Sequence, residues 1–180
     1  MHTPEAPPGL VDILIADDEA LVRALVRRLL EREGYACAEA ADGRQAVELA
    51  QRRPPRCVLL DLGMPELDGF AVARRLRADP RTRAAHIHCL SGSGDPASRA
   101  QASQAGCEEF LAKPLDAAAL LRVVRRDVDR AEPRWVSGLT KAEAEDLLDW
   151  LEANGYPPAE LSLREDGFAV RCPGLRESPP

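Results

Sequence analysis

The sequence predicts an α/β protein: a five-stranded, parallel, doubly wound sheet with helices on both faces, followed by a small helix-hairpin unit. Three observations support this fold class. Short apolar runs alternate with segments of helical periodicity up to about residue 131. Four of these runs end directly in polar or charged residues, as expected for parallel strands whose carboxyl ends share one sheet edge. Near the C-terminus, Asp166-Gly167 separates two short alternating segments, a strong signal for a β-hairpin.

The first strand-helix-strand unit is predicted from its apolar pattern. Asp12–Ala16 is an aliphatic run typical of a buried strand. Residues 19–33 carry apolar side chains three and four positions apart with arginines between them, which predicts a helix that Gly34 ends. A second, shorter strand is expected at 35–41.

The second helix is expected at 44–52, where Asp42 can cap its start and Pro54-Pro55 ends it. The apolar run Cys57–Leu60 then indicates a strand buried on both faces. This strand delivers Asp61 to its carboxyl end.

The same alternation continues to the end of this region. Further helices are expected at 68–77, 95–105 and 116–128, and further strands at 86–90 and 108–112. Five strands alternating with five helices imply a parallel sheet with right-handed crossovers, because each helix must pack back onto the sheet.

The composition is that of an ordinary globular protein. The 180 residues are 45% hydrophobic, enough for a core, and the formal net charge of −6 disfavours nonspecific binding to nucleic acids or anionic membranes. No apolar run approaches the roughly 18 residues that a membrane span needs, so we expect a cytoplasmic protein. The five cysteines form no CxxC pair and no metal-binding spacing, which favours buried, reduced thiols.

Polar side chains at the strand ends form the candidate site. They are Asp17, Asp18, Asp61, Ser91 and Lys113. Three carboxylates that meet at one sheet edge repel one another unless a cation lies among them, and carboxylate oxygens suit Mg²⁺. Magnesium with a nearby lysine suits phosphoryl transfer, and Asp61 is the natural nucleophile because it stands alone at its strand end.

These residues and their neighbours resemble the receiver domain of two-component response regulators. The resemblance covers residues 10–131 and rests on five motifs in order, namely Asp17-Asp18, Asp61 with Met64-Pro65, Asp68-Gly69, Ser91-Gly92 and Lys113-Pro114. It implies a flavodoxin-like sheet with strand order 2-1-3-4-5.

The resemblance also implies a role for each site residue. Asp61 would be the phosphoacceptor, and Lys113 would bridge to the phosphoryl group. Mg²⁺ would be bound by Asp18 and Asp61 directly, by Asp17 through water and by the backbone carbonyl of Gly63.

A switch pair and partners follow from the same resemblance. The Ser91 hydroxyl would move towards the phosphate and the Phe110 ring would turn inward, while Gly92 leaves room for the phosphate to approach. A sensor histidine kinase or histidine phosphotransfer protein would be the phosphodonor. Such a protein is a phosphoacceptor and switch rather than an enzyme.

Two other functions fit part of this pattern. A receiver-like scaffold would bind partners without being phosphorylated. A haloacid-dehalogenase-like phosphatase would also use an aspartate after an apolar strand, with Mg²⁺ and a lysine, but it needs a second carboxylate where this chain has Gly63.

The chain is expected to divide into five regions. These are a disordered leader at 1–9, the receiver domain at 10–131, a hinge at 132–138, a small αββ unit at 139–173 and a frayed tail at 174–180.

The αββ unit is predicted from a helix and a hairpin. Apolar residues repeat three and four apart from Thr140 to Ala153, and Thr140 with Glu143 forms a capping box. A two-residue loop at Asp166-Gly167 would pair Leu163 with Val170 and Leu161 with Cys172.

The charge of the tail favours protein partners over nucleic acid. Counting from Pro133, it has five Lys/Arg against nine Asp/Glu and no basic recognition helix. We therefore expect a protein-binding or self-associating unit, and no binding to DNA or membranes.

Overall fold

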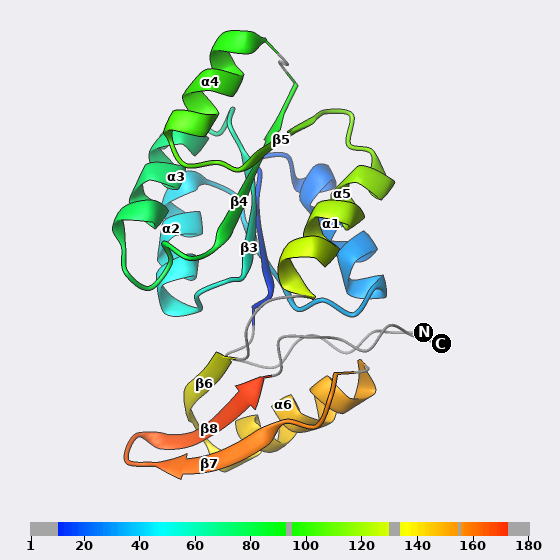
Figure 1. Ribbon diagram of the computed structural model, residues 1–180, viewed down its shortest axis with the longest axis vertical. Coiled ribbons are helices and arrows are strands. Elements are labelled where there is room, and N and C mark those ends of the chain that lie inside the picture. The colour runs from blue at the N-terminus through cyan, green and yellow to red at the C-terminus, as the bar shows by residue number, and fades with distance from the viewer. Residues whose placement is uncertain (1–10, 93–94, 130–133, 155, 173–180) are drawn as a thin grey trace.

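The computed structural model describes residues 11–92, 95–129, 134–154 and 156–172. The predicted leader at 1–9 and tail at 174–180 lie outside the described residues. Two sheets are present, a parallel sheet in the first region and an antiparallel sheet near the C-terminus (Figure 1).

The first sheet confirms the predicted fold class. Its parallel strands lie in the order β2-β1-β3-β4-β5, as the family resemblance implied. The strands are β1 (Ile13–Ala16), β2 (Cys37–Ala40), β3 (Cys57–Asp61), β4 (His86–Ser91) and β5 (Glu109–Ala112).

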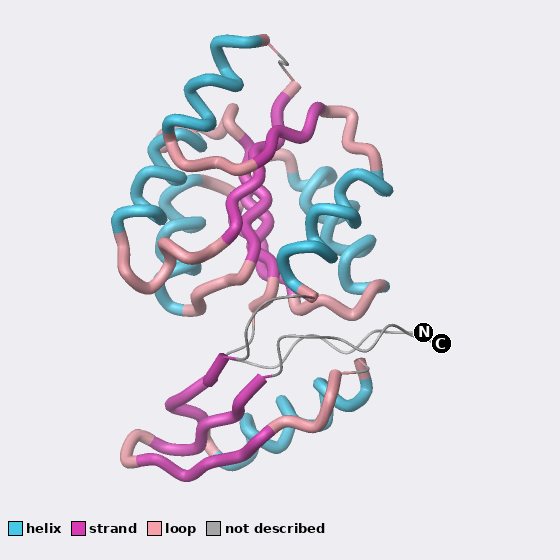
Figure 2. The backbone as a smooth tube through the Cα atoms, viewed as in Figure 1, coloured by secondary structure: helices cyan, strands magenta, loops and turns pink. Residues whose placement is uncertain are grey.

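Five helices cover this sheet, and Figure 2 shows the strands as a layer between them. The helices are α1 (Ala20–Arg32), α2 (Gly43–Arg52), α3 (Gly69–Ala78), α4 (Pro96–Gln104) and α5 (Ala117–Val128). Aspartate side chains accept hydrogen bonds from first-turn N–H groups at the starts of four of them, α2 to α5. These caps fix where the helices begin, and all boundaries lie within one or two residues of those predicted.

The core has two layers because successive strand residues point to opposite faces. In β1, Leu14 and Ala16 face the layer under α2, α3 and α4, whereas Ile13 and Ile15 face the layer under α1 and α5. All four side chains are at most 1% exposed. Such two-sided burial explains why β1, like β3 up to Asp61, is a continuous apolar run.

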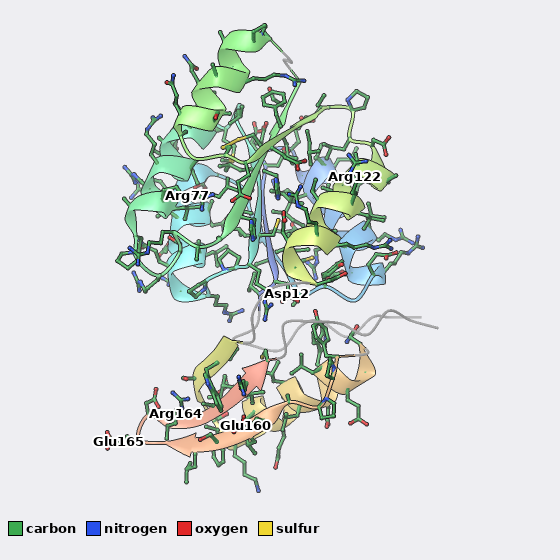
Figure 3. All side chains as sticks on the ribbon, viewed as in Figure 1. Asp12, Arg77, Arg122, Glu160, Arg164 and Glu165 are labelled. Atoms are coloured by element: carbon green, nitrogen blue, oxygen red, sulfur yellow. A yellow bond between two sulfur atoms is a disulfide. The ribbon has the colours of Figure 1, made fainter. Side chains whose placement is uncertain are left out.

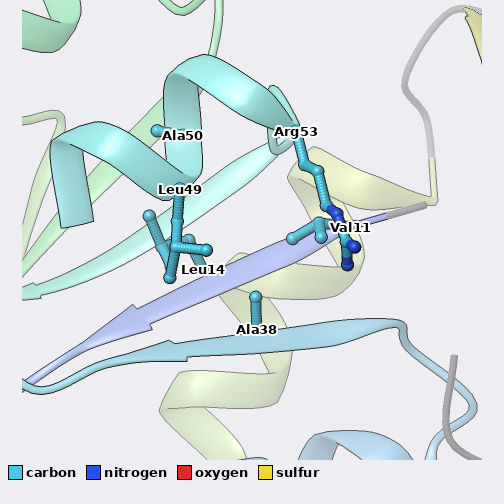
Figure 4. Close-up of a pocket in the computed structure, with 6 residues that line it drawn as sticks. All are labelled: Val11, Leu14, Ala38, Leu49, Ala50 and Arg53. Carbon is cyan, nitrogen blue, oxygen red and sulfur yellow. The ribbon is translucent and has the colours of Figure 1, made fainter. Parts of the chain in front are cut away.

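The packing of α2 on β1 and β2 leaves only a small gap (Figure 4). It is lined mainly by apolar side chains, from Val11, Leu14, Ala38, Leu49 and Ala50, with Arg53 at its end. Its volume of about 10 Å³ is at most that of one water, so this gap is a packing defect and no ligand site.

Two of the five cysteines come together in the fold. Cys89 of β4 and Cys107 before β5 have their sulfurs in contact, with 6.3 Å between their Cα atoms. Sequence spacing could not show that the fold brings them together. Burial raises the pKa of the Cys37 and Cys57 thiols well above the usual value, so these two stay protonated and unreactive.

The C-terminal unit contains one strand more than predicted. Its antiparallel sheet has the order β6-β8-β7, with β6 (Arg134–Leu139), β7 (Glu160–Arg164) and β8 (Gly167–Cys172), and it packs against α6 (Lys141–Ala153). Residues 134–138 of the predicted hinge therefore belong to a strand. This strand was not predicted, because Ser137 and Gly138 interrupt the alternation of apolar and polar residues. The β6 register shifts at this point, between Val136 and Leu139.

The hairpin exists, but its predicted register was wrong by two residues. Leu163 pairs with Phe168, and Leu161 pairs with Val170, so the loop is Glu165-Asp166. Gly167 lies in β8 with φ of +125°, and a Cβ there would meet the Leu139 carbonyl oxygen at 2.7 Å. Both its positive φ at the end of the turn and the close approach of β6 require this glycine.

The C-terminal unit lies at the amino ends of the receiver strands (Figures 1 and 3). The Tyr156 hydroxyl donates a hydrogen bond to Asp12 Oδ2 at 3.1 Å, just before β1. Ala36, just before β2, packs in the same apolar cluster as Leu147 and Val170. Among the described helices, none is long and apolar enough to cross a membrane.

Candidate functional site

The opposite edge of the sheet brings together residues from the ends of three strands. Lys113 Nζ lies 2.8 Å from Asp17 Oδ2 and 3.4 Å from Asp61 Oδ2. Asp17 follows β1, Asp61 ends β3 and Lys113 follows β5. The convergence expected from parallel strand ends is thus present in the structure.

The acidic residues are arranged so that one ion can contact all three. Asp17, Asp18 and Asp61 can each offer one carboxylate oxygen within 4.8 Å of the others. Asp17 and Asp61 are buried, while Asp18 is exposed at the edge. Asp17 Oδ2 is also buried and pairs with the Lys113 ammonium at 2.8 Å. Three clustered carboxylates of this kind suit a hard divalent cation.

The acidic loop is held by α1. Asp17 Oδ1 accepts a hydrogen bond from the Glu19 backbone N–H at 2.9 Å. Arg23 Nη1 donates to the carbonyl oxygens of Asp17 and Asp18 at 2.7 and 3.1 Å. Sequence analysis missed Arg23, because it was one of several arginines on a helix and no local pattern marked it.

Asp61 is positioned by a close approach of α3 to the end of β3. A Cβ at Gly69 would lie 2.3 Å from the Asp61 carbonyl oxygen, so only glycine fits there. The Gly63 N–H donates a hydrogen bond to the Asp61 carboxylate, and a side chain at Gly63 would begin 3.7 Å from Asp61 Oδ2. The carboxylate is therefore fixed by backbone on one side and by Lys113 on the other.

The electrostatics around Asp61 and Lys113 favour the binding of a second cation. Burial raises the pKa of Asp61 above its ordinary value, and Asp17 adds to this, although Lys113 opposes it. For Lys113, burial alone would lower the pKa, but the carboxylates of Asp17 and Asp61 outweigh it and raise the pKa. Lys113 thus stays charged, yet one ammonium does not offset the repulsion among the carboxylates.

The predicted switch residues lie on β4 and β5, next to this cluster. Ser91 is 8% exposed, and its carbonyl accepts a hydrogen bond from the Lys113 N–H at 2.8 Å. A Cβ on Gly92 would meet no described heavy atom within 4 Å, so the edge is open there. Phe110 is half-buried, and the Arg99 guanidinium of α4 lies 5.0 Å from its ring centroid.

A second group of possible metal ligands lies at the amino end of β4. It consists of His86, Glu108 and Asp127. Here arginines already compensate the carboxylates, since Arg77 Nη2 lies 3.1 Å from Glu108 and Arg126 Nε 2.6 Å from Asp127. This cluster needs no cation, in contrast to the site around Asp61.

The doubly wound sheet with this acidic site defines the class of receiver domains. The chain belongs to the response regulator receiver domain family, whose model matches residues 13–125.

Relatives agree with this assignment. The transcriptional regulatory protein SrrA of Staphylococcus aureus is 35% identical over 130 residues, which cover 68% of this chain and 53% of SrrA. The chain thus spans about half the length of the curated relatives it matches.

Two solved structures share the fold of the first region. One is the receiver domain of the sensor histidine kinase PA1611 from Pseudomonas aeruginosa PAO1, with a magnesium ion coordinated in its active site cleft. Its TM-score is 0.60 at 33% identity, covering 64% of this chain and 94% of that one. The other is a response regulator protein from Burkholderia pseudomallei with a phosphorylated aspartic acid and a calcium ion, with a TM-score of 0.59 at 27% identity, covering 64% and 66%.

Proposed function

We propose that this protein is a response regulator that accepts a phosphoryl group on Asp61 with Mg²⁺ bound beside it. The observation that carries the proposal is the position of Lys113 Nζ, within 3.4 Å of both Asp17 and Asp61 at an open sheet edge. A buried nucleophile, a fixed ammonium and an acidic cluster are the groups that phosphoryl transfer requires. The magnesium in PA1611 and the phosphorylated aspartate in the Burkholderia protein support the same reading.

The residues would act as follows. An Asp61 carboxylate oxygen attacks the phosphorus of a phosphohistidine on a sensor kinase or phosphotransfer protein. The P–O bond forms as the P–N bond breaks, and the imidazole leaves with the electron pair. Lys113 offsets charge on a phosphoryl oxygen, and the Ser91 hydroxyl donates a hydrogen bond to another.

The metal would be held by the acidic loop. Asp18 and Asp61 would coordinate it directly, Asp17 through water, and the Gly63 carbonyl would supply a further oxygen. When bound, Mg²⁺ neutralises charge on the phosphoryl oxygens. The protein fixes the geometry of this site, because Arg23 holds the loop that carries Asp17 and Asp18.

The phosphorylated state would act through Ser91 and Phe110. Movement of the hydroxyl towards the phosphate frees space that the Phe110 ring can enter, and the ring would then leave Arg99 of α4. This movement shifts an existing equilibrium at α4 and β5 rather than creating a new fold. The protein is then a cytoplasmic switch rather than a catalyst.

We further propose that the C-terminal unit binds protein, either a downstream partner or a second copy, and not nucleic acid or membrane. Its one helix in the described part of the chain, α6, carries an acidic exposed face formed by Glu145, Asp146, Asp149 and Glu152. Carboxylates on that face repel a phosphate backbone. The receiver domain model ends at residue 125, so this unit lies outside it.

The test is direct phosphorylation by a small phosphodonor. The full chain is incubated with acetyl phosphate and Mg²⁺, and its intact mass is measured. Wild type should gain one phosphoryl group, Asp61→Asn should gain none, and chelation of the metal should abolish the gain. Asp149→Asn, the same change on the exposed face of α6, is the matched control and should behave as wild type. Equal labelling of wild type and Asp61→Asn would disprove the assignment, and no labelling of either would favour a phosphorylation-independent scaffold.

A further inference from the structure

β7 is an edge strand with an exposed apolar side. It forms one border of the sheet order β6-β8-β7. Leu161 is 47% exposed and Leu163 is 73% exposed, although their partners Val170 and Phe168 lie in or against the apolar cluster under α6. Paired residues point to the same face, so the two leucines extend this apolar face beyond the reach of α6.

The backbone of β7 also presents hydrogen-bonding groups outwards. The hairpin closes at the pair Arg164–Gly167 around a two-residue loop, so Arg164 directs its N–H and C=O towards β8. Hydrogen-bonding direction alternates along a strand. Leu161 and Leu163 therefore direct their N–H and C=O away from the sheet, where an edge strand pairs with another strand.

The sequence of β7, Glu-Leu-Ser-Leu-Arg, is complementary to itself in the antiparallel direction. With a two-fold axis at Ser162, each Leu161 faces Leu163 of a second copy, and each Glu160 faces Arg164. Figure 3 shows Glu160 and Arg164 at opposite ends of the strand. The outward N–H and C=O groups of Leu161 and Leu163 then form the backbone hydrogen bonds between the two copies. Each Glu160–Arg164 pair joins opposite charges.

We propose that β7 pairs antiparallel with β7 of a second copy of this chain, centred on Ser162, to join the two three-stranded sheets into one. The pairing covers the exposed leucines of both copies and pairs the β7 edge, which has no partner strand among the described residues. The pairing specifies the self-associating surface of the proposed function. Its role in signalling, but not the pairing itself, rests on that function.

Other registers are less favourable. Moving the axis to Leu163 would place Leu161 opposite Glu165 and Glu160 opposite Asp166, an apolar-charged pair and a like-charged pair. Moving it to Leu161 would leave Leu163 opposite Ala159 and lose the charge pairs. Because register in a sheet is set by such side-chain pairs, Ser162 is the favoured centre.

The charge pattern also favours a second copy over a different partner. An unrelated peptide could add to the edge, but β7 of a second copy already matches acid to base and leucine to leucine in this register. Glu160 keeps its contact to Arg171 within the chain at 3.5 Å, and both side chains are at least half exposed, so the acid remains accessible.

The experiment measures the self-association of the full chain by analytical ultracentrifugation over a concentration series. Wild type should form a dimer. Leu163→Lys should raise the dissociation constant at least about tenfold, because each dimer contains the altered pair twice. Leu25→Lys, at a leucine of α1 that is 61% exposed, is the matched control and should leave the dimer unchanged.

A charge exchange tests the register. Glu160→Arg should weaken the dimer, because arginine would then face Arg164, and Glu160→Arg combined with Arg164→Glu should restore it. A wild-type monomer throughout, or a dimer that Leu163→Lys leaves intact, would overturn the proposal, as would failure of the double exchange to recover any affinity.

Phosphorylation and pairing can be separated. Asp61→Asn should dimerise through β7 while losing phosphoryl uptake, and Leu163→Lys should be phosphorylated while losing the dimer. A wild-type chain that takes up a phosphoryl group at Asp61 but stays monomeric would refute the pairing alone. A dimer without phosphoryl uptake in wild type would refute the proposed function alone.

Discussion

The repulsion stored at the acidic site predicts how metal and mutation change stability. Asp17 and Asp61 are both buried and can approach within 4.8 Å of each other. At that separation and an effective dielectric constant of about 20, two unit charges repel by about 3 kcal/mol. Lys113 relieves part of this, but the raised pKa of Asp61 shows that burial and Asp17 outweigh it.

Magnesium should therefore stabilise the folded protein strongly. At a concentration about 100 times its dissociation constant, a ligand that binds only the folded state adds about 2.7 kcal/mol. For a chain of this size, about 2–4 °C accompanies each kcal/mol, so the midpoint of thermal unfolding should rise by about 5–10 °C. Differential scanning calorimetry with and without EDTA measures this shift.

Asp61→Asn should raise the stability measured in EDTA and reduce the stabilisation by magnesium. In EDTA at neutral pH the variant should be more stable than wild type, because it removes a buried charge while Lys113 keeps Asp17 as its partner. The gain is present above the raised folded pKa of Asp61 and disappears as pH falls towards about 3.9, where the unfolded carboxyl is also protonated. Its magnesium shift should be much smaller.

The matched control is Asp149→Asn, which should retain the wild-type shift. A variant Asp61→Asn that unfolds at a lower temperature than wild type in EDTA would show that Lys113 stabilises the ionised carboxylate more than burial destabilises it. An undiminished magnesium shift in that variant would place the metal elsewhere.

Three further perturbations test other contacts. Lys113→Met should cost about 1–3 kcal/mol in urea unfolding, because it leaves the buried Asp17 carboxylate without its cation; equal stability would contradict the ion pair. Burial lowers the pKa of His88, so wild type should lose stability between about pH 7.5 and pH 5.5 as the unfolded histidine takes up a proton, and His88→Gln should lose that slope. Tyr156→Phe should cost about 0.5–1.5 kcal/mol and speed proteolysis of the C-terminal unit, because it removes the hydrogen bond to the carboxylate before β1; unchanged proteolysis would show that the bond does not secure the unit.

The receiver fold could be predicted because its signals are local. β1 is a continuous apolar run and β3 is one up to Asp61, and each helix from α2 to α5 starts at an aspartate. Asp17, Asp61, Ser91 and Lys113 stand at strand ends. Parallel topology alone then brings Asp17, Asp61 and Lys113 together. The strand order was available only from the family resemblance, since no local pattern specifies which strands are neighbours.

The features that were missed depend on distant contacts. β6 breaks its alternation at Gly138, so only pairing with β8 reveals it as a strand. The hairpin register was misread because Gly167 lies just after the loop, in β8, where it also meets Leu139 closely. Arg23 acquires its role only when α1 folds back over the acidic loop.

The site and the C-terminal unit lie at opposite ends of the sheet, so a signal between them has to travel along it. β4 is one of the strands that reach both ends. Ser91 ends it beside the acidic cluster, and His86 begins it at a cavity of about 660 Å³ that Trp135 of β6 also lines. Between them, His88 Nε2 lies 2.6 Å from Asp127 of α5, which ties the strand to the helix that leads towards the C-terminal unit.

This path makes Trp135 the reporter of coupling. The chain has two tryptophans, and Trp150 is 5% exposed in the core of the C-terminal unit, whereas Trp135 is 37% exposed at the cavity. In a Trp150→Phe background, beryllofluoride with Mg²⁺ should change the Trp135 emission, and adding Asp61→Asn or Ser91→Ala should abolish the change. If the analogue binds and the emission stays constant, β4 and α5 do not transmit the switch to this end of the sheet. The C-terminal unit would then act independently of Asp61.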